Sequence, residues 1–364
     1  MLLRRLEMLN FRNFARQAVE PGLYFNVLSG RNAQGKTNIL ESIYLACTGR
    51  SFRTAREKEL IKREKEFSSI RCLFETRGRE VEVKVTLVPG RKRIEVNGVL
   101  KSGHPFGWPG VVLFTPDDLV MIKGSPAERR RFLDYDLGPF HPHYAHCLDR
   151  YNRVLSQRNA LLREAKEKRT TGGPLEVWDE QLCRYGSRLL FLRVSLLKKF
   201  FPAIRALHRE LTEGAENIEI SYLSSLKIGE ECGEDEIYER FSGELRLVRD
   251  EEIARMQTLV GPHRDDLHIK VDGHDARVYC SQGQQRTIVL TLKVFLIEQW
   301  RSETGEYPIL LLDDVLFELD DNRREALMCR LGGLVQTFLT CTRVNFDIEG
   351  FKAKVFTVSG GEVT

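Results

Sequence analysis

The sequence lacks the features that mark several classes of protein. It contains no apolar run that approaches the ~20 residues needed to span a membrane. Residues 1–6 include neither a long apolar stretch nor a plausible leader cleavage site. None of the eight cysteines forms a Cys-x-x-Cys pair, and several lie in apolar runs, where a free cysteine behaves as a small hydrophobe. We therefore expect a soluble cytoplasmic protein with no disulfide framework and no membrane partner.

The sequence also lacks a large excess of charge of either sign. The 56 Lys and Arg residues against 52 Asp and Glu residues leave a net charge of +4, which permits nucleic-acid binding without requiring it. The local balance is less even, with 15 basic and 8 acidic residues over 50–101, and 13 acidic and 4 basic residues over 212–252. Both stretches are also consistent with solvated faces. No helix-turn-helix, zinc finger or aromatic-rich strand pair indicates base reading.

The strongest motif that is present is a glycine-rich loop, Gly30-x-x-x-x-Gly35-Lys36-Thr37, between an apolar strand (24–29) and a helix (38–46). Its glycines let backbone N–H groups face phosphate oxygens, and the helix adds its positive end. Lys36 can reach the β- and γ-phosphates, and the Thr37 hydroxyl can hold Mg²⁺. The predicted ATP contacts are Gly30, Arg31, Asn32, Ala33, Gln34, Gly35, Lys36, Thr37 and Asn38. Arg12 and Asn13 either flank the nucleotide or only shape a loop.

Two adjacent carboxylates, Asp313 and Asp314, follow an apolar strand predicted over 309–312. Asp313 would bind Mg²⁺, directly or through water, and Asp314 would orient or deprotonate the attacking water. Alone, such a pair could cap a helix or form a turn. Together with the glycine loop it predicts ATP hydrolysis, with ATP and Mg²⁺ as cofactors and with Lys36, Asp313 and Asp314 as catalytic residues.

A second anion-binding element, Ser281–Arg286, opens another predicted helix. It is close in chemistry to the signature loop of ABC ATPases, which contacts the ATP of a partner subunit. Ser281, Gly283 and Gln284 would then act in trans, so an ATP-dependent homodimer is expected. The alternative is simple helix capping by Ser281.

The order of predicted elements indicates an α/β nucleotide domain that is split by an insertion. A first strand (2–11) and an antiparallel meander (69–99) precede a helical hairpin within 125–211, which is interrupted at 170–174. Alternation then returns with helix 287–302, strand 309–312, helix 322–331 and strand 337–340. We predict that residues 1–118 and 253–364 form the nucleotide domain, and that 119–252 form an inserted helical lobe.

Several motifs in this order resemble the RecF family of bacterial DNA replication and repair proteins, which are related to the SMC ATPases. Besides the two loops and the aspartate pair, they are Asn10–Phe14, Thr48–Arg53, Phe114–Leu119 and Gly261–Leu267. The resemblance spans essentially the whole chain. It implies an ABC-type ATPase head, a P-loop NTPase with a mixed sheet, flanking helices and an antiparallel subdomain, in which the helical lobe replaces the long SMC coiled coil.

The same resemblance implies what the protein does. ATP would drive dimerisation on single-stranded or duplex DNA, followed by slow, DNA-stimulated hydrolysis. The protein would act with RecO and RecR to load RecA at gaps, in recombinational repair, replication restart and induction of the SOS response.

The resemblance also implies further residue roles. Asp320 lies in a D-loop-like segment that signals across the dimer, although Phe317 stands where Ser is common. Thr340 occupies the position of a switch histidine. Asp117 lies where ABC ATPases carry a glutamine loop, and Asp314 where many carry Glu, a difference that fits slow turnover.

The basic stretch predicts contacts to DNA phosphates, which give salt-dependent and sequence-independent binding. The candidate residues are Arg50, Arg53, Arg56, Arg91, Lys92 and Arg93. Two other features are weaker. The segment Gly261–Arg264 either presents Arg264 at a functional surface or forms a turn between strands. The cluster His141, His143, His146 and Cys147 lacks the second ligand pair that a zinc site needs.

Three other functions share some of these motifs. An ABC-type transport subunit would need a membrane partner, and usually a glutamine loop and a switch histidine, neither of which is found. A small-molecule kinase would need an acceptor pocket that the sequence does not reveal. A non-enzymatic adaptor would bind ATP without hydrolysing it.

Overall fold

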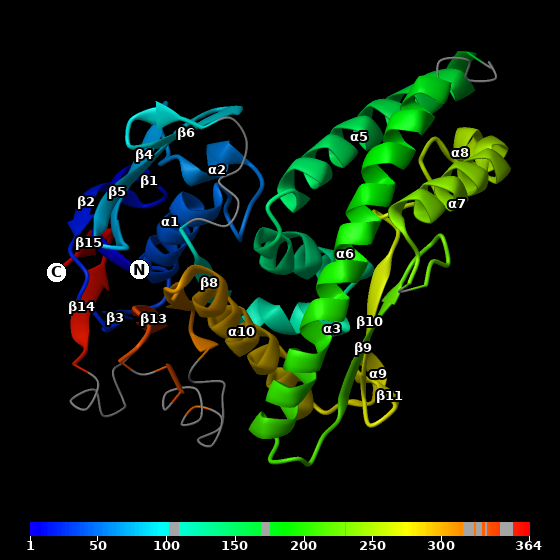
Figure 1. The fold of residues 1–364 in the computed structure, drawn as a ribbon. Helices are drawn as coiled ribbons and strands as arrows, with labels where there is room; N and C mark the ends of the chain where they lie inside the picture. The colour runs from blue at the N-terminus through cyan, green and yellow to red at the C-terminus, as the bar shows by residue number, and fades with distance from the viewer. Residues whose placement is uncertain are drawn as a thin grey trace. The chain divides into compact units, whose positions relative to one another are not determined.

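The computed structural model describes residues 1–101, 109–168, 175–229, 231–315, 324, 330–331, 333–342 and 352–364. The chain forms two compact units, a head unit (1–118 and 292–364) and a helical unit (119–291), seen in Figure 1. The first boundary lies where the sequence predicted it. The second lies inside helix α10 (Gln282–Thr304) and not near residue 253. The reason is that β10 (Asp266–Val271) pairs along its length with β9 (Ile218–Leu223), which holds this segment in the helical unit.

The head unit contains an antiparallel sheet with the strand order β2-β1-β4-β5-β6-β7. Its strands are β1 (Leu2–Phe11), β2 (Phe14–Val19), β4 (Ser68–Thr76), β5 (Arg79–Val88), β6 (Arg91–Val96) and β7 (Val99–Leu100). The predicted meander is confirmed, because β4, β5, β6 and β7 pair antiparallel in sequence order. Buried residues alternate with more exposed ones along β4 and the second half of β5. Sequence reasoning missed β2, whose exposed residues interrupt the apolar pattern.

A second sheet in the head unit has the order β15-β14-β3-β13-β12-β8. Its strands are β3 (Phe25–Ser29), β8 (Val111–Phe114), β12 (Ile309–Leu312), β13 (Thr337–Cys341), β14 (Lys354–Ser359) and β15 (Glu362–Val363). All neighbours except the pair β14–β15 run parallel. The short central strands β3 and β12 are almost continuously buried, as expected for a parallel sheet that is covered on both faces.

Helix α1 (Lys36–Thr48) shares one hydrophobic core with both sheets of the head unit. Its buried residues are not confined to one stripe, which is typical of a helix surrounded by other elements. Ile39, Leu40 and Ile43 are fully buried, and each buried side chain of this size stabilises the fold by roughly 1.5–3 kcal/mol. This packing fixes the N-terminus of α1 in space. A short helix, α2 (Glu57–Leu60), follows it.

The helical unit is built around the predicted hairpin, now seen as α5 (Tyr144–Lys168) and α6 (Leu175–Leu211) (Figure 1). Its other helical segments are α3 (Val120–Lys123), α4 (Pro126–Phe132), η2 (Leu133–Leu137), η3 (Gly138–Phe140), α7 (Glu234–Leu247), α8 (Arg249–Arg255) and α9 (Ala276–Tyr279). A small sheet, β11-β10-β9, adds the strand β11 (His274–Asp275).

Two predicted segments lie outside the described residues, the hairpin interruption at 170–174 and most of the helix at 322–331. Of the helices that are described, none is both long and apolar enough to cross a membrane.

Candidate nucleotide site

The sequence motifs of the head unit meet at one edge of the parallel sheet. Strands β3, β12, β13 and β14 run in the same direction, so their carboxyl ends lie at the same edge. The glycine loop follows β3, the aspartate pair follows β12, and Thr340 lies near the end of β13. Crevices outside the carboxyl ends of parallel strands are where α/β proteins bind their ligands.

The glycine loop leads directly into α1. Gly35, which precedes the helix, has φ +119°, a conformation that favours glycine. The Lys36 ammonium donates hydrogen bonds to the carbonyl oxygens of Gly30 (2.6 Å) and Arg31 (3.0 Å). The loop therefore curls around the Lys36 ammonium, and only 4% of this residue is exposed.

Thr37 and the aspartate pair are in direct contact. The Thr37 hydroxyl donates to Asp313 Oδ1 at 2.9 Å, and Thr340 Oγ1 lies 2.9 Å from the same oxygen. Thr340 also accepts the backbone N–H of Asp314 at 2.8 Å and lies 3.3 Å from Asp314 Oδ1. The fully buried Thr340 thus lies within hydrogen-bond distance of both carboxylates. Asp314 has φ +54°, an uncommon conformation that is found more often at functional sites.

The donor set suits Mg²⁺, which prefers hard oxygen ligands. Thr37 and Asp313 present a hydroxyl and a carboxylate oxygen to each other, beside the phosphate loop. Burial raises the pKa of Asp313 above its ordinary value, and the nearby Asp314 carboxylate acts in the same direction, whereas hydrogen bonds from Thr37 and Thr340 oppose it. A cation at this position would favour the ionised carboxylate.

The two residues that were predicted to flank the nucleotide, Arg12 and Asn13, make different contacts in the structure. Arg12 makes a bidentate pair with Glu41 of α1 (2.8 and 2.7 Å) and donates to the Glu59 carbonyl. Glu41 is fully buried, so this contact supports a structural role for Arg12. Asn13, in contrast, lies at the loop, where its amide donates to the Gln34 carbonyl at 2.8 Å. The proposed ATP contacts of both residues remain predictions.

Arg53, whose contact with DNA stays a prediction, follows α1, and its side chain reaches back to the first turns of that helix. Its guanidinium donates to Asn38 Oδ1 at 2.9 Å and lies 3.8 Å from the Glu41 carboxylate. Its charge also opposes the rise in the pKa of Asp313. Sequence reasoning missed Glu41, whose position four residues after Thr37, on the α1 turn that follows the loop, was the available signal.

The Ser281–Arg286 loop belongs to the helical unit and opens α10. Ser281 Oγ accepts the backbone N–H of Gln284 (3.2 Å), and the Gln284 side chain accepts that of Ser281 (2.9 Å). This reciprocal capping box matches the alternative interpretation of the loop, helix capping. Ser281 is nevertheless exposed. A role for Ser281, Gly283 and Gln284 in trans remains a prediction.

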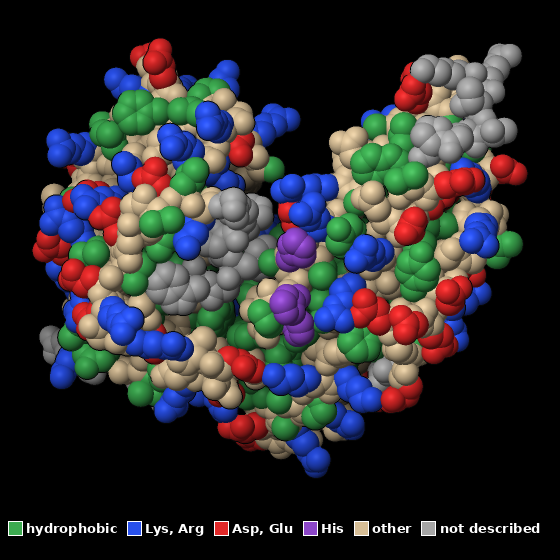
Figure 2. Space-filling model, turned by 45° about the horizontal axis from the view of Figure 1, so that its top comes forward, with side chains coloured by type: hydrophobic (Ala, Val, Ile, Leu, Met, Phe, Trp, Pro, Cys, Tyr) green, Lys and Arg blue, Asp and Glu red, His purple; other side chains and the backbone are tan. Residues whose placement is uncertain are grey.

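The other predicted DNA contacts are spread over two parts of the head unit. Arg91 and Arg93 are exposed on β6, and Arg56 is exposed before α2, with its guanidinium 3.6 Å from Glu59. The pKa of Lys92 is lowered, mainly by burial and further by Arg50, so these two cations are close enough to interact. Figure 2 shows Lys and Arg interspersed with Asp and Glu on the visible face of the head unit. DNA contact by these residues stays a prediction.

Of the remaining candidate motifs, one lies outside the described residues and the others can be located in the structure. The D-loop-like segment, 317–320 with Asp320, lies outside the described residues. Asp117 is exposed in a 3-10 turn, Pro116–Leu119. Gly261–Arg264 forms a turn that leads into β10. Within the described part of the chain, no cluster of three or more His, Cys, Asp or Glu side chains is arranged to hold a metal ion, and this includes the histidines around 141–146.

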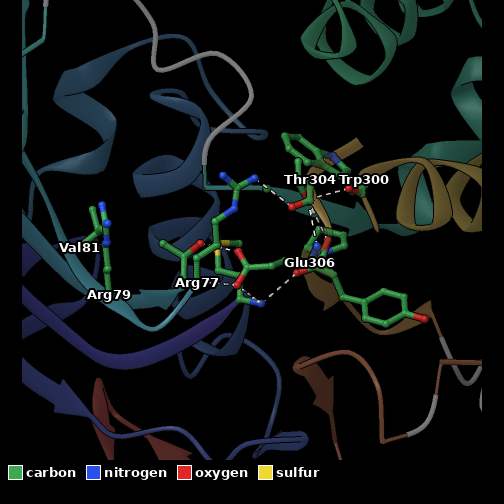
Figure 3. Close-up of a pocket in the computed structure, with 11 residues that line it drawn as sticks. Arg77, Arg79, Val81, Trp300, Thr304 and Glu306 are labelled. Carbon is green, nitrogen blue, oxygen red and sulfur yellow. Dashed lines mark hydrogen bonds and ion pairs between the residues drawn. The ribbon is translucent and has the colours of Figure 1, made fainter. Parts of the chain in front are cut away.

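One cavity of the head unit, of about 470 Å³, contains no residue of the glycine loop (Figure 3). It is lined by Met1, Thr76, Arg77, Arg79, Val81, Gly110, Trp300, Thr304, Glu306, Tyr307 and Pro308. Glu306 accepts the Arg77 backbone N–H (2.8 Å), and the Arg77 guanidinium donates to the Thr304 carbonyl (2.9 Å). Because these polar groups satisfy one another, we assign the cavity no part in nucleotide chemistry.

A phosphate loop and a paired-carboxylate strand in one mixed sheet, beside an antiparallel sheet, define a P-loop ATPase with an ABC-type head. The family described as "AAA domain" matches residues 5–251. A solved SMC head bound to the C-winged helix domain of ScpA shares the fold, with a TM-score of 0.55 at 18% identity over 100% of this chain and 96% of that one.

Full-length relatives narrow the class further. "DNA replication and repair protein RecF" of Desulforamulus reducens is 43% identical over 93% of this chain and 92% of the relative. The protein of the same name from Alkaliphilus oremlandii is 39% identical over 100% of both chains. A solved structure of the recombination mediator protein RecF-ATP in the RecFOR pathway has a TM-score of 0.90 at 36% identity, covering 100% of this chain and 96% of that one. The chain belongs to the RecF family.

Proposed function

We propose that this protein is an ATP-dependent DNA-binding protein of recombinational DNA repair and replication restart, and a weak, DNA-stimulated ATPase. The observation that carries the proposal is the contact of Thr37 in the phosphate loop with Asp313 at the carboxyl edge of the sheet, 2.9 Å apart. This arrangement unites a phosphate-binding element with carboxylates that can serve hydrolysis. The DNA part of the proposal rests on membership in the RecF family, whose relatives are named as DNA replication and repair proteins.

Each residue of the site has a distinct task in the proposed reaction. The loop N–H groups and Lys36 would bind the phosphates of ATP, and Thr37 with Asp313 would hold Mg²⁺, which supplies charge neutralisation at those phosphates. Asp314 would orient the attacking water or accept its proton. Thr340 would position the pair, since its hydroxyl accepts the Asp314 backbone N–H at 2.8 Å and lies 2.9 Å from Asp313 Oδ1 and 3.3 Å from Asp314 Oδ1.

We further propose that ATP closes two copies of the chain around DNA, with Ser281, Gly283 and Gln284 of one copy at the phosphates of the other. The exposed position of Ser281 at the start of α10 supports this. RecR, RecO and RecA are the proposed partners, at single-strand gaps and in SOS induction. The proposed location is the cytoplasm, where bacterial DNA lies. The transport alternative lacks support, because the full-length relatives are named as DNA replication and repair proteins.

The test is the rate of ATP hydrolysis with Mg²⁺ and with no DNA, single-stranded, duplex or gapped DNA, at two salt concentrations. We expect slow basal turnover that DNA raises and that higher salt reduces, since phosphate contacts release counterions. Asp314→Asn should abolish turnover and retain ATP binding. A rate that none of the three DNA forms changes would contradict the DNA part of the proposal, and unchanged turnover in Asp314→Asn would contradict the assigned site.

A further inference from the structure

The glycine loop is held from outside by the tips of two β-hairpins of the head unit. One tip is the turn between β1 and β2, a hairpin whose two-residue loop is formed by Arg12 and Asn13. The other is the turn between β14 and β15, formed by Gly360 and Gly361. The two turns are far apart in the sequence, and both contact the loop that the proposed function assigns to ATP phosphates.

The Asn13 side chain forms hydrogen bonds on both sides of Gly35, to Gln34 in the loop and to Asn38 in α1. Its side-chain amide donates to the Gln34 carbonyl (2.8 Å), and its oxygen accepts from the Asn38 amide (2.8 Å). A Cβ added at Gly35 would lie 2.7 Å from Asn13 Nδ2, a distance that real side chains do not tolerate. The Asn13 side chain therefore occupies the space that a Cβ at Gly35 would need.

The β14–β15 hairpin contacts the loop at both of its ends. A Cβ added at Gly30 would lie 2.2 Å from the Val358 carbonyl oxygen of β14. At the other end, the Gly360 N–H donates to the Gln34 side-chain oxygen at 2.7 Å. The backbone at Gly361, which has φ +83°, lies so close to Asn13 that a Cβ there would be 2.8 Å from its carbonyl oxygen.

The two hairpins are also tied to each other. The side-chain amide of Gln17, on β2, donates to the Val363 carbonyl, and its oxygen accepts the Val363 N–H, both at 3.2 Å. Asn13, Gln34 and the Gly360–Gly361 turn thus form a closed set of contacts. Within this set, a displacement of one hairpin tip changes the space available to the loop.

We propose that the β14–β15 turn and Asn13 form a loop brace that sets the conformation of the phosphate loop for nucleotide binding. In this arrangement Asn13 and Gly361 are positioning residues that act through the loop backbone and need not contact ATP. Because coupling between a binding site and a second element is reciprocal, bound ATP must in turn stabilise the β14–β15 turn. The inference rests on the proposed binding of ATP at this loop.

The first test compares two glycines at hairpin tips. Gly361→Ala places a Cβ against Asn13, whereas Gly98→Ala, at a turn with a similar φ of +75°, meets no atom within 4 Å. We expect Gly361→Ala to raise the Kd for methylanthraniloyl-ATP with Mg²⁺ by about tenfold or more, and Gly98→Ala to change it less than about twofold. The thermal unfolding midpoints of both variants report any general loss of structure.

A second variant acts away from the loop. Gln17→Ala removes the tie between β2 and Val363 and leaves the phosphate loop untouched. We expect a smaller increase in Kd, of about threefold. An affinity equal to that of the unaltered protein in both Gly361→Ala and Gln17→Ala would overturn the inference. Absence of ATP binding by the unaltered protein would instead refute the proposed function.

A third test uses the unaltered protein, so its result does not depend on whether a variant folds. Hydrogen–deuterium exchange is followed in peptides that cover 355–364, with the peptide around the β6–β7 turn, 96–100, as the control. We expect Mg²⁺-ATP to slow exchange in the β14–β15 peptide and to leave the control peptide unchanged. Equal exchange with and without ATP in peptide 355–364, under conditions where peptides of the glycine loop are protected, would overturn the coupling.

Discussion

At the scale of single residues, we expect the hydroxyl of Thr340 to hold the aspartate pair in place. The sequence placed Thr340 at a switch position, and the structure shows it in contact with both carboxylates. We predict that Thr340→Val, which keeps the shape and removes the hydroxyl, lowers kcat for ATP by about tenfold or more and leaves the Kd for ATP within about threefold. Loss of one buried hydrogen-bond partner should also cost about 1–3 kcal/mol of stability.

Thr340→Ser is the matched control, because it retains the hydroxyl. It should preserve most of the turnover measured in steady-state ATPase assays. Equal kcat in Thr340→Val and the unaltered protein would show that the aspartates keep their positions without this contact.

His263 in the helical unit predicts a pH-dependent stability. Burial lowers the pKa of His263 to about 4, and Arg264, Arg130 and Arg193 act in the same direction, whereas a hydrogen bond to Thr258 opposes it. The Tyr151 hydroxyl lies 2.6 Å from Nδ1, and Nε2 lies 3.1 Å from the Thr258 carbonyl oxygen, which suits a neutral ring. The unfolded chain therefore takes up this proton first as the pH falls.

Because the folded pKa lies below the unfolded value of about 6.5, the stabilisation is complete above that pH and is lost between pH 6.5 and 4. Between pH 7.5 and 5 we expect a loss of about 2 kcal/mol from this residue. Urea titrations of the unaltered protein and of His263→Gln, which does not titrate, measure the difference. The same pH dependence in both proteins would contradict the assignment.

At the scale of elements, α6 and α7 pack through a glycine. A Cβ at Gly186 of α6 would lie 2.5 Å from the Phe241 ring of α7 and 2.9 Å from the Tyr151 ring. Gly243, on the exposed face of α7, meets nothing within 4 Å. We predict that Gly186→Ala destabilises the helical unit by about 1–3 kcal/mol, whereas Gly243→Ala stabilises it by up to about 1 kcal/mol.

Thermal unfolding of these two variants checks the pair, since both make the same chemical change. A stabilising effect of Gly186→Ala would mean that α6 and α7 move apart at no cost. The comparison depends only on helix packing, so it does not depend on the proposed function of the protein.

Elements were predictable where a periodic pattern was strong. The hairpin α5–α6 was expected from leucines and aromatics at helical spacing, and the central strands from short apolar runs. Helix α7 was missed, because its acidic residues resembled a solvated stretch. Its buried face consists only of Ile237, Phe241 and Leu245, which recur every four residues. Sparse apolar residues become a helix face only when a neighbour such as α6 covers them.

At the scale of the whole molecule, the proposed composite site predicts ATP-dependent dimerisation. Asp314→Asn should retain ATP, accumulate as a dimer with Mg²⁺-ATP and remain monomeric with Mg²⁺-ADP. Size-exclusion chromatography with light scattering measures the mass. Ser281→Arg, which adds a bulky side chain at the start of α10, is expected to prevent the dimer in the Asp314→Asn background. A monomer in ATP for Asp314→Asn alone would contradict the composite site.

The sequence by itself determined the phosphate loop and the aspartate pair, because each depends on residues close together in the chain. Only the tertiary structure decided which distant residues support them. Asn13 and Gly360 both bond to Gln34, although they lie in hairpins of two different sheets. Thr340 reaches Asp313 because β12 and β13 are parallel neighbours, which brings their carboxyl ends to one edge. Strand order depends on packing over the whole core, which local patterns do not encode. The pairing of β10 with β9 likewise places residues 266–271 in the helical unit, although the sequence had assigned them to the nucleotide domain.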